Sequence, residues 1–142
     1  MSAEPERPDK FPKSAPDEGS YDAETAPWPT ELRLIRDEAR LEVEFSDGRS
    51  FALPAEYLRV ESPSAEVQGH GPSQKKIVAG RRRVKITALD PIGHYAVRIV
   101  FDDGHDTGIF SWSYLRELGE EQAERWAAYQ ANLQARGLSR DP

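Results

Sequence analysis

The chain has 142 residues, of which 37% are hydrophobic and 31% charged, with no cysteine and a formal net charge of −6 at pH 7. This length suits one small domain with tails, and no apolar run approaches the roughly 18 residues of a membrane-spanning helix. The lack of cysteine excludes disulfides, thiolate nucleophiles and cysteine-ligated metal or iron–sulfur centres. The acidic charge disfavours nucleic acid as a partner, and the absence of a secretory signal leads us to expect a cytoplasmic protein.

Residues 1–27 combine several prolines with many acidic residues and almost no aliphatic ones. Such a segment cannot bury enough apolar surface to offset its ordering entropy, so we predict a disordered acidic tail. A solubilising tail is the simpler interpretation, and an acidic tether for a partner is the alternative.

Residues 28–118 are predicted to form the domain. Alternating apolar residues indicate half-buried strands, and the Asp-Gly pairs at 47–48 and 103–104 indicate hairpin turns. Ser111 is suited to cap a second helical turn. In the first half of the domain, we predict strands over 31–36, 41–45 and 49–53, a helical turn over 55–58 and a loop over 61–74. In the second half, we predict a strand over 84–89, a turn at 90–93, strands over 97–101 and 107–110, and a helical turn from 112.

The pattern of this domain occurs twice. FSDG at 45–48 matches FDDG at 101–104, and YLR at 57–59 matches YLR at 114–116, with offsets of 56 and 57 residues. We therefore predict an α+β fold: a small, antiparallel-rich β-sheet of five or six strands, built from two related hairpin-plus-helical-turn units, with a C-terminal helix. The predicted core is Leu34, Leu41, Val43, Phe45, Tyr57, Leu58, Val84, Ile86, Val97, Ile99, Phe101, Ile109, Trp112, Tyr114 and Leu115.

The C-terminal part, residues 119–137, is predicted to be a helix. Gly119 is expected to break the chain, 120–135 to be helical, Gly137 to terminate the helix, and 138–142 to fray. A weakly apolar stripe is expected to pack on the domain itself, and the alternative is a contact with another chain, such as a homodimer partner. The stripe consists of Gln122, Trp126, Tyr129 and Leu133.

A cluster of positive charge follows the predicted loop. It could be a docking patch for an acidic protein partner or for RNA phosphate, or a solvated edge whose charges discourage strand aggregation. Nearby aromatic residues are too few for a nucleic-acid stacking platform. The candidate partner-binding residues are Lys75, Lys76, Arg81, Arg82, Arg83 and Lys85.

His105 is the leading candidate for chemistry because it lies next to a turn between Asp103 and Asp106. A histidine with nearby carboxylates can bind a metal or act as a base, although a histidine beside an exposed turn is more often solvated. His70 lies between glycines and could join His105 in a weak composite metal site. His94 precedes a predicted strand and is expected to have no chemical role.

No catalytic residue is expected. Ser111 and Ser113 lack the surroundings of a nucleophile elbow, and Gly69-His70-Gly71 lacks the ending of a phosphate-binding loop. A small hydrolase or transferase therefore ranks below a binding module.

Two motifs carry a family resemblance. EYLRVESPSAEV at 56–67 and DGHDTGIFSWSYLREL at 103–118 resemble the DUF971 family, also named the γ-butyrobetaine-hydroxylase-like N-terminal domain. The resemblance covers roughly residues 32–118 and is to a stand-alone bacterial-type member.

The resemblance implies where a metal would bind in related domains. Metal-binding members of the family hold a structural zinc with three cysteines and one histidine, and these positions fall on Ser62, Ser64, Val67 and His105 here. Hydroxyls are poor zinc ligands and valine is none, so we expect no cofactor and, in place of the metal, a hydrogen-bonded junction of Ser62, Ser64 and His105.

The resemblance also implies a function. Related domains are fused to dioxygenase catalytic domains and to P-loop iron–sulfur carriers, and this chain resembles the accessory module without the enzyme. We expect a non-catalytic protein-interaction domain, an adaptor in iron–sulfur cluster assembly that docks on a P-loop carrier. The alternative is a metal-binding domain that holds iron or zinc with His105 and loop residues.

Overall fold

The computed structural model describes residues 26–69 and 75–142, and most predicted elements are present in it. The first half of the chain contains β1 (Pro29–Ile35), a short 3-10 helix (Arg36–Glu38), β2 (Arg40–Phe45), β3 (Ser50–Pro54), α1 (Ala55–Val60) and α2 (Ala65–Gln68). The second half contains β4 (Ile86–Ile92), β5 (Ala96–Phe101), β6 (Gly108–Ser111), α3 (Trp112–Glu120) and α4 (Gln122–Ala135).

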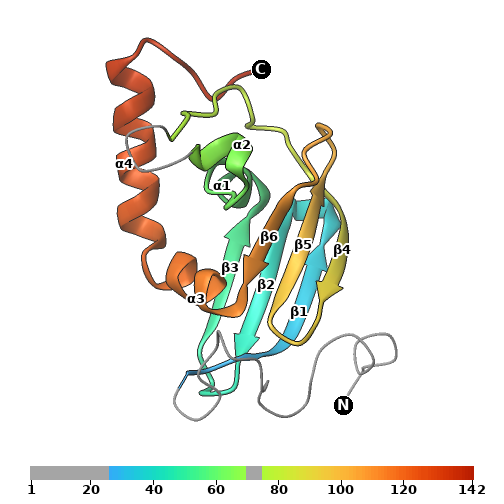
Figure 1. Cartoon of the computed structure of the whole chain (residues 1–142). Helices are drawn as coiled ribbons and strands as arrows, with labels where there is room; N and C mark the ends of the chain where they lie inside the picture. Colours follow the sequence, from blue (N-terminus) through green and yellow to red (C-terminus); the bar gives the residue numbers. More distant parts are fainter. Residues whose placement is uncertain (1–25, 70–74) are drawn as a thin grey trace.

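The strands form two antiparallel sheets, with orders β1-β2-β3 and β4-β5-β6. The two sheets face one another, and α4 stands to one side of them beside α1 and α2 (Figure 1). Each half of the chain is thus an antiparallel three-stranded meander followed by a helix. This confirms the α+β class and the repeat, with the six strands divided between two sheets.

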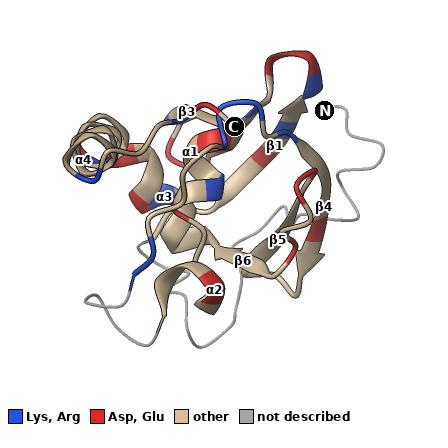
Figure 2. Cartoon of the chain, turned by 90° about the horizontal axis from the view of Figure 1, so that it is seen from above, with Lys and Arg blue, Asp and Glu red and all other residues tan. Residues whose placement is uncertain are grey.

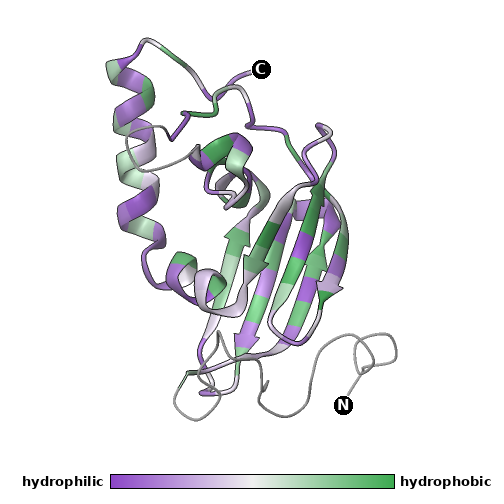
Figure 3. Cartoon of the chain, in the orientation of Figure 1, coloured by the Kyte–Doolittle hydropathy of each residue, from purple (hydrophilic) through white to green (hydrophobic). Residues whose placement is uncertain are grey.

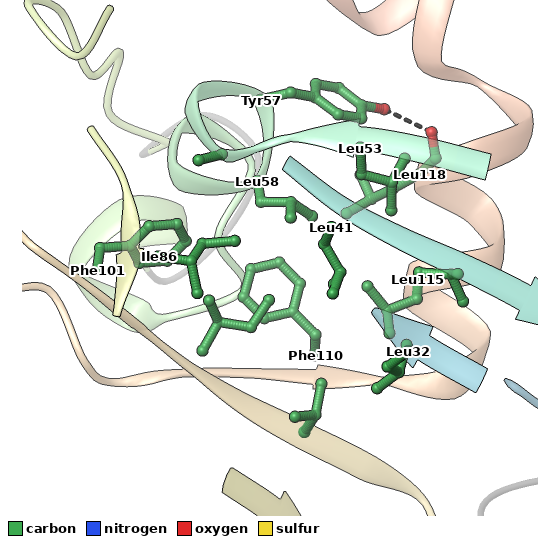
Figure 4. Packing of buried hydrophobic residues seen from close by; sticks show 14 of the residues in the cluster. Leu32, Leu41, Leu53, Tyr57, Leu58, Ile86, Phe101, Phe110, Leu115 and Leu118 are labelled. Carbon is green, nitrogen blue, oxygen red and sulfur yellow. Dashed lines mark hydrogen bonds between the residues drawn. The ribbon is translucent and has the colours of Figure 1, made fainter. Parts of the chain in front are cut away.

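The core lies between the sheets, where side chains of both sheets and of α3 meet (Figure 4). Hydrophobic and hydrophilic bands alternate along the strands, as a half-buried sheet requires (Figure 3). One predicted core residue was wrong: Ile109 is 47% exposed, and its neighbour Phe110 is fully buried. Leu34 and Tyr114 are only partly buried against the core.

The two units hold each other through reciprocal contacts. Asp47 in the β2–β3 turn binds Arg116 of α3, with 2.8 Å between Oδ2 and Nη2. The equivalent Asp103 in the β5–β6 turn binds Arg59 of α1, with 2.8 Å between Oδ2 and Nε. Each hairpin turn therefore anchors the helix of the other unit.

A second reciprocal pair repeats the arrangement at the helix ends. The Tyr57 hydroxyl donates to the carbonyl of Leu118 at 2.7 Å, and the Tyr114 hydroxyl donates to the carbonyl of Glu61 at 2.6 Å. The two tyrosines are 57 positions apart in the sequence, and so are the two residues whose carbonyls accept. These contacts relate the units by an approximate two-fold axis.

Several predicted boundaries were wrong. The chain does not break at Gly119, because α3 continues to Glu120 and a Cβ at Gly119 would lie 2.5 Å from the Phe51 ring. β4 continues through the predicted turn to Ile92, since Pro91 lies on an edge strand, where a missing N–H is tolerated. The predicted loop contains α2, while its residues 70–74 lie outside the described part of the chain, as do residues 1–25 of the predicted tail.

The C-terminal residues are held rather than frayed. The Gly80 amide donates to the carbonyl of Ser139, and Arg140 forms a bidentate ion pair with the buried Glu56. Gly137 terminates α4 with a positive φ of 67°, as predicted. None of the helices in residues 26–69 and 75–142 is long and apolar enough to cross a membrane.

The apolar stripe of α4 packs on its own domain. Tyr129 and Leu133 are buried against Val60 and the segment 77–79, with Trp126 at the edge of this small second core. The Tyr129 hydroxyl donates to the carbonyl of Val78 at 2.5 Å. Within the described residues, α4 therefore fixes the segment that carries the basic cluster.

Candidate functional site: a buried serine–histidine junction

The predicted junction of Ser62, Ser64 and His105 forms where the end of α1 meets the β5–β6 hairpin. The Ser62 Oγ and the His105 Nε2 are 2.9 Å apart, and the Ser64 Oγ is 2.7 Å from the Thr107 Oγ1. All three predicted residues are buried, so His105 is not the solvated turn residue that its position favours. The backbone N–H of Ser64 also donates to the Ser62 Oγ.

Glu66 completes this network, and the sequence analysis missed it. Its carboxylate lies 3.0 Å from the His105 Nδ1. Because a carboxylate only accepts, a neutral His105 carries its proton on Nδ1, and its Nε2 then accepts from the Ser62 hydroxyl. Ser64 caps α2 by accepting from the Glu66 amide, and this cap positions Glu66 over the histidine.

The surroundings favour this neutral form of the histidine. Burial and the positive charge of Arg59 lower the pKa of His105 below its ordinary value. The hydrogen bond and charge of Glu66 and the charge of Asp103 raise this pKa, but their effect is smaller than that of burial and Arg59. Glu66 is largely exposed, so water weakens its attraction for an imidazolium.

The hydrogen bonds link a serine, a histidine and a carboxylate, as in a nucleophilic catalytic triad, but the serine hydroxyl is not accessible to a substrate. Ser62 is 0% exposed, and a Cβ at Gly108 would lie only 2.5 Å from its Oγ. A nucleophile must reach its substrate, and here backbone occupies that space. The network therefore joins two segments of chain rather than presenting a reactive hydroxyl.

Asp103 extends the junction towards the basic segment. Its Oδ2 accepts from the Nε of Arg59 at 2.8 Å and from the Nε of Arg81 at 2.7 Å, while its Oδ1 accepts from the His105 amide. Burial raises the pKa of Asp103, but the hydrogen bonds from Arg59 and His105 and the charges of both arginines outweigh it, so this pKa lies below its ordinary value. The carboxylate thus links α1, the β5–β6 turn and the segment before β4.

The residues of the junction do not fit a zinc ion. Val67 offers no donor atom, the two serines offer neutral hydroxyls, and both ring nitrogens of His105 have other partners. The described residues contain no group of three histidines, cysteines or acids that could hold a metal. His70 lies outside the described residues, and His94 is exposed, with its carbonyl accepting from the Trp112 indole.

The basic candidates divide into two groups. Lys75, Arg81 and Arg82 are held by Glu61, Asp103 and Asp141 respectively. The side chains of the others are exposed and make no ion pair with any described residue; these are Lys76, Arg83 and Lys85. Figure 2 shows positive charge along the stretch that leads from α2 towards β4.

The fold and the junction define a small α+β domain of two related units that a buried serine–histidine contact joins. The chain belongs to the family described as gamma-butyrobetaine hydroxylase-like, N-terminal, whose model matches residues 32–116. No match is found among curated proteins.

Three solved structures are similar to this chain in sequence and fold. One solution NMR structure is 45% identical, covers 87% of this chain and 92% of its own, and has a TM-score of 0.73. A second is 43% identical, covers 82% and 91%, and has a TM-score of 0.72. A crystal structure of a DUF971-family protein of unknown function from Acidithiobacillus ferrooxidans ATCC 23270 is 41% identical, covers 65% and 92%, and has a TM-score of 0.55.

Metal content tests the interpretation of the junction. We expect the tag-free protein to retain no stoichiometric zinc, because three of the four positions that the resemblance implies as zinc ligands carry serine or valine, which do not bind it well. The triple variant Ser62→Cys/Ser64→Cys/Val67→Cys is expected to retain about one zinc per chain, measured by mass spectrometry of the metal. Adding His105→Ala to the triple variant should weaken retention. One zinc per chain in the natural protein would contradict the expectation.

Proposed function

We propose that this chain is a non-catalytic protein-interaction domain, an adaptor that docks on a P-loop iron–sulfur carrier in the cytoplasm. The observation that carries the proposal is a group of exposed cations on a chain of net charge −6, Lys76, Arg83 and Lys85, which have no acidic partner among the described residues. Unpaired charges of one sign steer an acidic partner and set its orientation. With no cysteine, the domain cannot hold a cluster by thiolates, so its part in assembly would be to bind the carrier.

Contacts between this surface and the rest of the domain support the docking role. Arg81 is fixed by Asp103, Arg82 by Asp141, and the segment 77–79 packs on α4. The paired arginines hold the segment in place, and the neighbouring cations remain available. A surface that is ordered before binding loses less entropy when a partner docks.

Affinity capture from lysate, with mass spectrometry of the bound proteins, tests the proposal. We expect enrichment of a P-loop iron–sulfur carrier, and titration with the purified carrier should show binding that weakens about tenfold in Arg83→Glu/Lys85→Glu. These two residues are chosen because reversing Arg81 would also break its contact with Asp103.

The control is Arg33→Glu/Arg49→Glu, which changes the net charge equally at two other exposed positions, 57% and 56% exposed, where the arginines form only long surface ion pairs with Glu42 and Glu120. It should bind the carrier almost as well as the natural protein. Equal weakening by both pairs would reject the patch, and failure to bind any P-loop iron–sulfur carrier would reject the adaptor role.

A further inference from the structure

A pocket of about 460 Å³ opens beside the serine–histidine junction, on the side of the segment that precedes β4. Its charged walls come from Arg59, Glu66, Lys76 and Arg81, next to the ring of His105. Val67 and residues 77–79 complete the lining. Of the three cations that carry the docking proposal, Lys76 lines this pocket, whereas Arg83 and Lys85 do not.

Arg59 is the unusual member of this pocket. It is only 8% exposed, and its buried Nη1 has no hydrogen-bond partner among the described residues. Its Nε is already used by Asp103. A buried guanidinium nitrogen without an acceptor is costly, and such groups in native proteins call for a missing partner.

The charges around the pocket leave an excess of positive charge. Arg59 and Arg81 share a single oxygen of Asp103, and Lys76 has no acidic partner in the described chain. Glu66 is the acid in the wall, and it is turned to the His105 Nδ1. Three cations thus face two carboxylates, and both carboxylates already accept hydrogen bonds.

We propose that this pocket binds an oxyanion, a phosphate or carboxylate group carried by a small molecule. The guanidinium groups of Arg59 and Arg81 would donate to it, and Lys76 would supply a further charge from the rim. Planar guanidinium donors match both kinds of oxyanion, and burial of Arg59 strengthens its interaction. The volume leaves room for more than the anionic group alone.

Titration of the ¹⁵N-labelled full chain with inorganic phosphate, at constant ionic strength, tests this site. We expect saturable shifts of the amide resonances of residues 76–81 and of His105, and none with chloride. A parallel titration with acetate identifies the group: tighter phosphate binding assigns a phosphate ester, and tighter acetate binding assigns a carboxylate. The absence of saturable shifts with both anions would overturn the proposal.

Variants separate the pocket from general positive charge. Arg59→Gln and Arg81→Gln should each weaken the binding of phosphate or acetate about tenfold, as expected for the loss of a charged hydrogen bond. Arg83→Gln removes the same charge outside the pocket and should leave the affinity within about twofold. Arg81 lies nearer the surface than Arg59, so its variant keeps the test valid if Arg59→Gln does not fold. Equal weakening by Arg81→Gln and Arg83→Gln would overturn the proposal.

Discussion

Phe110→Ala is expected to lower the free energy of unfolding by about 3–5 kcal/mol, the largest effect of a single substitution that we anticipate. Phe110 is fully buried in the core between the sheets, opposite Val97 in the β5–β6 pairing. Its ring also lies 6.1 Å from the ring of Tyr114. Removing the ring leaves a cavity that two packed sheets cannot close by collapse.

Chemical denaturation measures this loss, and thermal denaturation should show a fall in melting temperature of more than about 10 °C. Ile109→Ala is the matched control, because it shortens an adjacent side chain that is 47% exposed. It should change the free energy of unfolding by no more than about 0.5 kcal/mol. Comparable losses in the two variants would contradict the burial of Phe110 and the exposure of Ile109.

This pair shows why the register of β6 could not be predicted from the sequence. Two large apolar residues follow each other there, so the alternation that reveals an inward face is missing. The register is set instead by pairing with β5 and by Gly108, whose lack of a side chain leaves room for Ser62. The hairpin turns, in contrast, depend on local Asp-Gly chemistry, and both glycines adopt the positive φ that this pair predicts, 90° at Gly48 and 92° at Gly104.

The junction was predictable only in part. The family resemblance placed Ser62, Ser64 and His105 together, and the structure confirms that they are close. Glu66 was missed because α2 is a single turn between Pro63 and Gly69, too short for a periodic pattern. Ser64 as an N-cap was the one available signal for that turn.

The contacts that each unit makes with the other could not be predicted from the sequence and are known only from the tertiary structure. The repeat identifies Asp47 with Asp103 and Arg59 with Arg116, but it does not say that each aspartate binds the arginine of the other unit. The same exchange explains the small residues at Gly108 and Gly119, each of which faces the opposite unit. Sequence similarity between the units identifies the equivalent residues, whereas the two-fold arrangement determines which of them contact each other.

Asp103→Asn is expected to lower the free energy of unfolding by about 3 kcal/mol at neutral pH. The substitution removes the charge that pairs with Arg59, whose side chain is only 10% exposed, and it also releases Arg81. An arginine left buried without its anion is the main cost. The asparagine can still accept from the His105 amide, so the turn itself is retained.

The pH dependence of this loss identifies its cause. Because the folded-state pKa of Asp103 is lowered, its contribution is fully present above the ordinary aspartate pKa of 3.8 and is lost as the pH falls from there through the folded-state pKa. Denaturation of the natural protein and of Asp103→Asn should therefore converge in acid. A difference in the free energy of unfolding that stays constant through this range would show that packing, rather than the charge of Asp103, makes the contribution.

The two-fold arrangement supplies the matched control for this substitution. Asp47 makes the equivalent ion pair with Arg116, and the hydrogen bond from that arginine lowers the pKa of Asp47 to about 2. Asp47 is 40% exposed, and Arg116 keeps a second anion, Glu120, 2.6 Å from its Nε, so Asp47→Asn should cost clearly less than Asp103→Asn at neutral pH. Equal losses would mean that leaving Arg59 without an anion among the described residues adds nothing, and they would also remove the physical basis for an anion site beside it.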